Sequence, residues 1–135
     1  QGRSGILLAG SPDFEKIIRK AARAVDVLIV GFHWGEEYKV RSGKRERELA
    51  RRAVDAGAAL VVGHHPHLPQ EVEIYRNAPI FYSLGNFIFD QNLSKETMSG
   101  LVVEVTLKEG RIHAWRTQKV VLDKTFRPSL VEIGE

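Results

Sequence analysis

Apolar residues repeat with a helical period in the first half of the chain and with a strand period in the second. The first repeat predicts an amphipathic helix with Ser11 as N-cap and Pro12 at its first position. A continuous apolar run over 26–32 predicts a strand that is buried on both faces. Residues 44–56 return to a helical period, and 59–62 form a second apolar strand.

After Pro69 the apolar period becomes two, which is typical of half-buried strands. The strand, helix and strand of the first half imply a right-handed crossover and a parallel pair. The second half predicts antiparallel strands at 72–75, 80–84, 101–108 and 111–122, with turns at Asn77-Ala78-Pro79 and Glu109-Gly110. We therefore expect an α/β fold whose mixed sheet has a short parallel portion and antiparallel C-terminal strands.

Histidines follow both predicted parallel strands. His33 comes directly after the first strand, and His65-Pro66-His67 follows the second. The carboxyl ends of parallel strands form the crevice where ligands bind, so these imidazoles should share one rim. A residue before proline is biased toward extended backbone, on which residues two apart face the same way. His65 and His67 should thus point into one space, at a separation that suits two adjacent ions.

The chain has no cysteine, so a metal would need nitrogen and oxygen ligands. Neutral imidazole binds zinc, iron and manganese, and carboxylates should complete the set. Glu37 is a candidate to hold a metal-bound water or a substrate amine, and Asn86 and Asp90 are candidates to line the same crevice. The alternatives are an exposed loop glutamate, an Asn86 required only by a turn, and a His33 that packs in the core beside Trp34.

Composition favours one globular domain, with 135 residues of which 43% are hydrophobic. The net charge is only +3, which argues against a nucleic-acid partner. A basic cluster over 39–52 could attract phosphate or a polyanion, or could simply be the solvated face of a helix. Residues 1–5 lack the apolar segment of a signal peptide, and His113 reads as an ordinary surface residue.

Three segments together resemble a known family: 30–38 (VGFHWGEEY), 55–67 (DAGAALVVGHHPH) and 79–90 (PIFYSLGNFIFD). In this order and spacing they are similar to the bacterial capsule synthesis family of the CapA or poly-γ-glutamate synthesis type. That family resembles the calcineurin-like metallophosphoesterases. The resemblance implies an αββα sandwich around a dinuclear centre of divalent metal ions such as zinc, manganese or iron.

Carried over by position, His33 resembles a ligand of the second metal, with His65 also on the second metal and His67 on the first. His64 falls between the glycine and this pair, where it would contact the ligands or the substrate. The superfamily's aspartate and Asn-His motifs have no match before Phe32. The resemblance therefore implies that residues 1–135 are the C-terminal portion of one such domain, without its N-terminal half, and that the isolated chain is inactive.

For the intact protein, the resemblance implies hydrolase-type chemistry on an anionic substrate or polymer in capsule or poly-γ-glutamate biosynthesis. It also implies an extracytoplasmic, membrane-associated location in a bacterium, beside membrane-associated polymer synthesis proteins. The alternative is a non-catalytic scaffold or polymer-handling subunit. Half a sandwich would leave an apolar strand face uncovered, made up of Leu101, Val103, Val105 and Leu107. We therefore expect the chain to form a homo-oligomer.

Overall fold

The computed structural model describes residues 7–131, so the segment 1–5 lies outside the described residues. No helix within 7–131 is long and apolar enough to cross a membrane. In chain order the elements are α1 (Phe14–Ala22), β1 (Ile29–His33), α2 (Lys44–Asp55), β2 (Leu60–His64), β3 (Val72–Tyr75), β4 (Ala78–Phe81), β5 (Ser99–Lys108), β6 (Arg111–Leu122) and β7 (Pro128–Val131).

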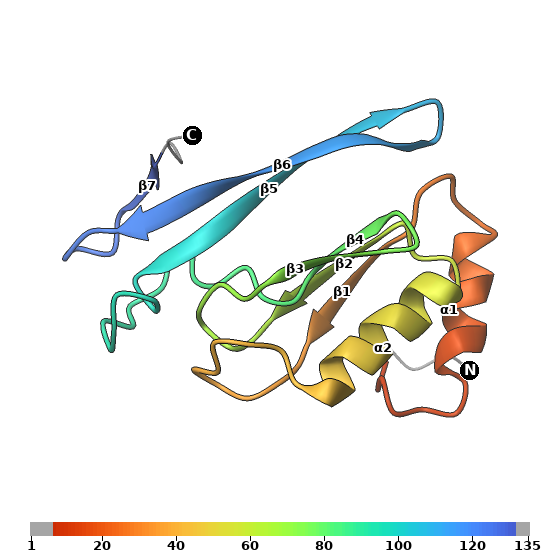
Figure 1. The fold of residues 1–135 in the computed structure, drawn as a ribbon, viewed down its shortest axis with the longest axis horizontal. Coiled ribbons are helices and arrows are strands. Elements are labelled where there is room, and N and C mark those ends of the chain that lie inside the picture. Colours follow the sequence, from red (N-terminus) through yellow and green to blue (C-terminus); the bar gives the residue numbers. More distant parts are fainter. Residues whose placement is uncertain (1–6, 132–135) are drawn as a thin grey trace, which may run out of the picture.

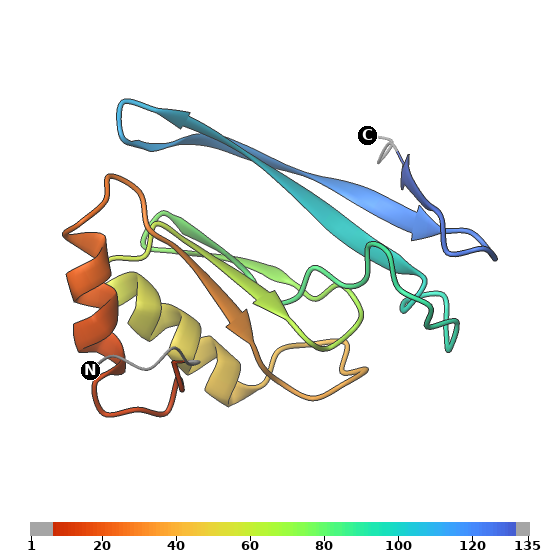
Figure 2. The same ribbon diagram turned by 180° about the vertical axis from the view of Figure 1, so that it is seen from behind.

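The strands form two sheets. The first has the order β1-β2-β4-β3, in which β1, β2 and β4 run parallel and β3 pairs antiparallel with β4. The second is the antiparallel sheet β5-β6-β7. The helices cover one face of the first sheet, and the long β5-β6 hairpin crosses its other side (Figures 1 and 2). The expected α/β fold with a mixed sheet and antiparallel C-terminal strands is confirmed.

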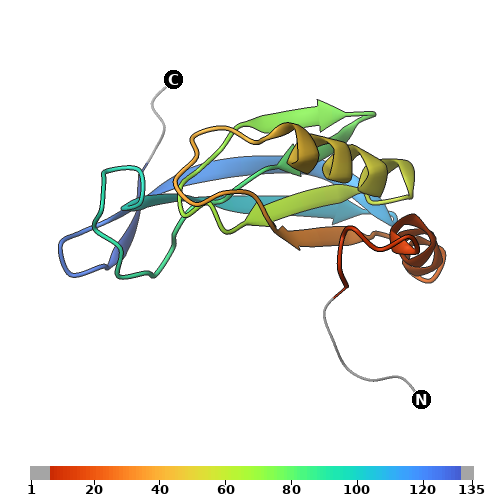
Figure 3. The same cartoon turned by 90° about the horizontal axis from the view of Figure 1, so that it is seen from below.

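The main core lies between the helices and the first sheet. Seen from below, α2 lies in front of the strands of that sheet (Figure 3). Phe14 and Ile18 of α1 and Ala53 of α2 are buried there. The small alanine side chains let α2 approach the sheet closely, while Phe32 and Trp34 stack with ring centroids 4.3 Å apart. This packing fixes the direction in which β1 leads into the following loop.

The expectation that the first apolar run is buried on both faces is wrong. Phe32 is buried toward the helices, but Ile29 and Gly31 are exposed on the opposite face. Among the described residues β1 pairs only with β2, and the second sheet leaves a groove of about 510 Å³ beside it. The groove is apolar and is lined in part by Leu60, Val62, Leu84, Leu101, Val103 and Val105. The apolar face of β5 thus faces the first sheet across an open groove.

Two local predictions also need correction. The first helix begins at Phe14 rather than after Ser11, whose Oγ instead accepts a hydrogen bond from the Asp13 N–H (3.3 Å). The β3-β4 turn is Arg76-Asn77, with φ of 48° and 67°, rather than Asn77-Ala78-Pro79. Two consecutive positive φ angles define the tight hairpin turn that matches the twist of the strands. Glu109-Gly110 has the same geometry, as predicted.

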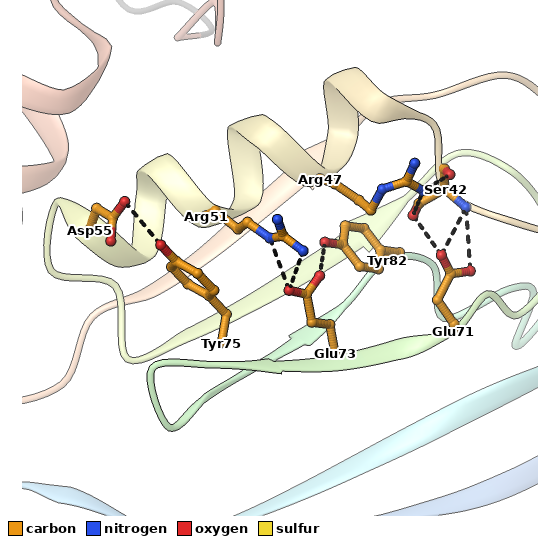
Figure 4. A network of polar contacts seen from close by, with 8 residues as sticks. All are labelled: Ser42, Arg47, Arg51, Asp55, Glu71, Glu73, Tyr75 and Tyr82. Carbon is orange, nitrogen blue, oxygen red and sulfur yellow. Dashed lines mark hydrogen bonds and ion pairs between the residues drawn. The ribbon is translucent and has the colours of Figure 1, made fainter.

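A polar network ties α2 to the first sheet (Figure 4). Arg51 lies 2.8 Å from Glu73 of β3, and the buried Tyr82 hydroxyl donates to the same carboxylate (2.7 Å). Burial and this hydrogen bond raise the pKa of Tyr82 above its ordinary value. Because each polar group has a partner, the arrangement holds helix and sheet in register. We call Arg51, Glu73 and Tyr82 the α2–β3 clamp.

Candidate metal centre

The carboxyl ends of β1 and β2 form the rim on which the histidines lie. His33 and His64 are directly paired in the parallel register. The Trp34 indole points inward and donates to the Tyr82 carbonyl (2.9 Å), so the preceding His33 must point outward. The alternative in which His33 packs in the core is therefore wrong, since its side chain is exposed.

Gly63 makes this arrangement possible. A Cβ atom at Gly63 would overlap the carbonyl oxygen of Tyr82 and would lie 2.5 Å from Nε1 of Trp34. Only a residue without a side chain lets the first sheet and the indole approach this closely. The glycine before the histidines is thus a packing requirement of the rim.

The His65-Pro66-His67 loop does not adopt the expected extended backbone. His65 has φ 106° and His67 has φ 62°, both in the region that disfavours non-glycine residues. Such strain persists where the surroundings fix the backbone. Pro66 is buried here, and its carbonyl accepts a hydrogen bond from the Tyr38 N–H (2.9 Å). The two imidazoles still lie near each other, with ring centroids 6.0 Å apart.

Glu37, His65 and His67 form a cluster of potential ligands. One ligand atom from each lies within 4.8 Å of the others, and Glu37 Oε1 is 3.9 Å from His67 Nε2. Ligand atoms that share a tetrahedral zinc with bonds of about 2.0–2.1 Å lie roughly 3.4 Å apart. A small contraction would therefore suffice for these three groups to share one ion. We call them the Glu37–His65–His67 group.

Asn86 determines which nitrogen of His67 is available. It is buried, its Nδ2 donates to the Thr97 carbonyl (2.9 Å), and its Oδ1 lies 3.1 Å from His67 Nδ1. Because the Thr97 carbonyl can only accept, Oδ1 must face His67 and Nδ1 must carry the proton. The lone pair then resides on Nε2, the atom that faces Glu37. A buried partner of this kind orients a metal-ligating histidine and fixes its tautomer.

The other predicted residues lie around this group. The His33 ring is 4.6 Å from the His65 ring, although His33 is outside the three-ligand group. His64 lines the groove between the sheets, and partial burial together with the nearby His33 lowers its pKa. Asp90 is exposed in the loop after β4, and His113 is exposed on β6, as expected for a surface residue.

Sequence reasoning missed three residues near His67. The Phe89 ring lies 5.0 Å from the His67 ring and the Tyr38 ring 6.1 Å from it. Gln91 Nε2 donates to the Tyr38 hydroxyl (3.0 Å). Tyr38 directly follows Glu37, and Phe89 directly precedes Asp90. Their position beside two candidate site residues was the one feature of the sequence that could have identified them.

Most of the basic cluster is engaged within the chain. The ion pairs that involve it are Lys39–Glu36, Lys44–Glu48, Arg51–Glu73 and Arg52–Glu15. This favours the interpretation of the cluster as a helix surface over that of a free polyanion site. A cavity of about 1070 Å³ does lie beside His33, with Lys44 and Arg45 among its lining residues and Glu36 and Glu46 also present.

The donor set fits a divalent metal. Two imidazoles and one carboxylate are ligands that zinc, iron and manganese accept. The chain has no cysteine, so no thiolate competes for the softer metals. Within residues 7–131 this is the one group of at least three such side chains close enough to share an ion. The described part of the chain therefore offers three ligands, the number that the protein supplies to a catalytic zinc ion.

Comparisons with known proteins match the sequence segments that carry this group. The family model described as "Bacterial capsule synthesis protein PGA_cap" matches residues 3–91. The chain is 43% identical over 106 residues to the PGA biosynthesis protein CapA of Bacillus subtilis, covering 78% of this chain and 28% of that protein. It is 49% identical over 77 residues to the capsule biosynthesis protein CapA of Bacillus anthracis, covering 57% and 19%.

A probable polyglutamine synthesis accessory protein of Mycobacterium tuberculosis is 38% identical over 68 residues, which cover 50% of this chain and 18% of that protein. The chain thus spans less than a third of the length of these relatives. Glu37, His65, His67 and Asn86 all lie within the residues that the family model matches. The resemblance seen in the three segments is confirmed, and the chain belongs to the bacterial capsule synthesis protein family.

Proposed function

We propose that this chain supplies the histidine-bearing rim of a metallophosphoesterase-like dinuclear centre, which performs hydrolase-type chemistry on an anionic substrate in capsule or poly-γ-glutamate biosynthesis. The observation that carries the proposal is the Glu37–His65–His67 group, in which Asn86 leaves Nε2 of His67 free to bind a metal. Two divalent ions in such a centre activate water and polarise a phosphoryl or acyl-type bond.

The chain's own residues have separate tasks in this proposal. His65 and His67 hold metal through neutral imidazoles, and Glu37 either completes the first ion's ligands or orients its water. His33 and His65 are assigned to the second ion and His67 to the first, which the 4.6 Å between the His33 and His65 rings supports. His64 contacts the ligands or the substrate, and Asn86 fixes the tautomer of His67.

An anionic substrate is supported by the name of one relative, which refers to PGA biosynthesis, because a glutamate polymer carries many carboxylates. The cavity beside His33 adds no electrostatic support. Lys44 and Arg45 line it, but Glu36 and Glu46 line it as well.

Calorimetric titration of the chain with zinc tests the metal site. We expect measurable binding at pH 7.5 that fades below about pH 6.5, where free imidazole becomes protonated. His65→Ala combined with His67→Ala should remove most of the binding, whereas His113→Ala on the distant β6 should leave it unchanged. Equal zinc binding by the double variant and the wild type would overturn the assignment.

The competing function is a non-catalytic scaffold or polymer-handling subunit. The composition of the Glu37–His65–His67 group favours this non-catalytic function, because within residues 7–131 the group contains one carboxylate and a dinuclear centre would need more. The two functions are separated in the full-length protein by replacing His65 and His67 with glutamine. A hydrolase loses polymer-related activity while the protein still accumulates, whereas a scaffold keeps it.

The surroundings of the protein are also part of this proposal. We place the intact protein outside the cytoplasm, associated with the membrane and with membrane-bound polymer synthesis proteins. For the isolated chain we propose a homo-oligomer, because within residues 7–131 β1 pairs on one side only and its Ile29 is exposed beside the apolar groove. Light scattering at micromolar concentrations should give at least twice the monomer mass, and a stable monomer would reject this expectation.

A further inference from the structure

The segment 87–93 lies next to the metal rim and has few attachments. Its two ends are fixed: Asn86 donates through Nδ2 to the Thr97 carbonyl (2.9 Å), and the Ser94 N–H donates to the Thr97 hydroxyl (3.0 Å). Between these points, the described residues show no backbone hydrogen bond to the rest of the chain. The large apolar side chains of the segment are exposed, at Phe87, Ile88, Phe89 and Leu93. Segments with few internal bonds and little burial open most readily.

One side-chain hydrogen bond holds the middle of this segment. Gln91 Nε2 donates to the Tyr38 hydroxyl (3.0 Å), while the buried Gln91 Oε1 has no hydrogen-bond partner among the described residues. The middle of the segment is therefore held by a single hydrogen bond at an exposed position, which is a weak attachment.

The closed segment places an aromatic ring at the metal group. Phe89 lies 5.0 Å from His67 between ring centroids, and Tyr38 lies 6.1 Å from the same imidazole. Both side chains are 40% exposed, so each keeps a surface that a ligand can contact. The backbone of Tyr38 is also held in place, because its N–H donates a hydrogen bond to the carbonyl of Pro66, which lies between the two histidines. One ring is therefore anchored and the other is carried by a loosely held segment.

We propose that Tyr38 and Phe89 are specificity-determining residues that contact the nonpolar part of the substrate, and that 87–93 is a flap closed by the Tyr38–Gln91 hydrogen bond. This inference rests on the proposed function, because it takes the Glu37–His65–His67 group as the place where the substrate's anionic group is held. It adds the residues that would recognise the rest of the substrate: two aromatic rings beside the metal group contact the nonpolar groups joined to the anion. Aromatic faces pack well against nonpolar groups but add little to the binding of a bare anion.

A comparison of two probes tests the aromatic contact. The zinc-loaded chain is titrated with a γ-linked glutamate oligomer and, separately, with inorganic phosphate. Phe89→Ala should weaken oligomer binding about tenfold, since a well-packed aromatic contact contributes on that order. The affinities for phosphate and for zinc should stay the same. Phe89→Tyr keeps the ring and should restore oligomer binding.

Backbone ¹⁵N relaxation tests the flap without needing any metal. Tyr38→Phe keeps the ring but removes the hydroxyl that Gln91 binds, so the order parameters over 87–93 should fall while those in β2 stay unchanged. Ile88→Ala is the matched control, because this exposed side chain lies in the same segment and lacks that hydrogen bond. Equal order parameters in wild type and Tyr38→Phe would overturn the flap.

The remaining outcomes separate this inference from the proposed function. If Phe89→Ala weakens phosphate and oligomer equally, Phe89 only positions His67 and the specificity assignment is wrong. If the wild type binds zinc but not the oligomer, the specificity assignment is wrong while the metal site stands. If zinc does not bind, the proposed function fails, and the relaxation comparison on the metal-free chain still decides whether the flap exists.

Discussion

The α2–β3 clamp and the 87–93 flap are built in opposite ways although both attach to the same stretch of chain. Tyr82, directly after β4, is fully buried and its hydroxyl has a carboxylate partner that an arginine also binds. A few residues later, the flap is exposed and the Gln91 carbonyl is left without a partner in the described residues. The chain thus passes from a tightly held sheet to a loosely held rim.

This difference shows how a small α/β unit divides its tasks. The helix-covered sheet fixes where β1 and β2 end, and therefore where His33 and His64 lie. The loops at that end then carry the side chains that would contact ions and substrate, as is common for sites on rigid scaffolds. Changes on the sheet side should therefore alter stability, and changes on the rim should alter binding.

The largest effect is expected at Gly63, under the rim. Gly63→Ala would drive a methyl group into the Tyr82 carbonyl and the Trp34 indole, and should lower the free energy of unfolding by about 3 kcal/mol or more. Gly31→Ala is the matched control on the neighbouring strand, where a Cβ has nothing within 4 Å. Urea unfolding followed by circular dichroism measures both. Equal stabilities of the two variants would show that the close approach at Gly63 is not essential.

The next effect concerns binding at Asn86, where the sheet and the rim meet. Asn86→Leu and Asn86→Asp both lose the donor to the Thr97 carbonyl, but only the leucine variant also loses the acceptor for His67. Zinc affinity should fall roughly 10–100-fold in Asn86→Leu and clearly less in Asn86→Asp. Calorimetry at pH 7.5 compares them. Similar losses in both variants would assign the effect to folding and not to the tautomer of His67.

A smaller effect is expected in the clamp. Tyr82→Phe removes the hydrogen bond to Glu73 and should lower the free energy of unfolding by about 1 kcal/mol at pH 7. Because the folded chain raises the pKa of Tyr82, this contribution is fully present below the ordinary tyrosine pKa of about 10 and is lost as the pH rises above it. The stability difference between wild type and variant should therefore shrink above pH 10. A constant difference across that range would argue against the Tyr82–Glu73 bond.

The smallest effect is expected on the flap itself. Ile88→Ala removes a side chain that is 69% exposed and should change the free energy of unfolding by less than about 0.5 kcal/mol. Thermal and urea unfolding should both show wild-type values. A loss above that range would mean that the flap is packed against something and that the contrast with the clamp is overstated.

The elements on the sheet side were largely predictable, because burial produces periodic patterns. The second helix was expected at 44–56 and spans Lys44–Asp55, and the strand expected at 111–122 has those bounds. The parallel pairing of β1 with β2 followed from the crossover rule. Errors arose where an apolar sequence is not buried or where a strand lacks an apolar pattern. The apolar run before His33 lies at an open groove. The strand β7 was not predicted, and it begins with Pro128, a residue type that is rare inside sheets.

The candidate site was less predictable than the sheet. Strand ends placed His33, His65 and His67 on one rim, but the positive φ angles of His65 and His67 depend on loop packing that no periodic pattern encodes. Glu37 was a candidate as a single loop residue, and only the fold brings its carboxylate to His67. The Tyr38–Gln91 contact joins residues far apart in sequence, so it leaves no local signal.

The two tryptophans provide separate optical reporters for the two sheets. Trp34 is buried in the helix-covered core with its indole nitrogen bound to a carbonyl, whereas Trp115 is 37% exposed on β6 and touches Phe81 edge-on. Their fluorescence should differ in emission wavelength and in access to a quencher. Single-tryptophan versions of the chain would therefore show by spectroscopy whether the β5-β6 hairpin detaches before the first sheet melts.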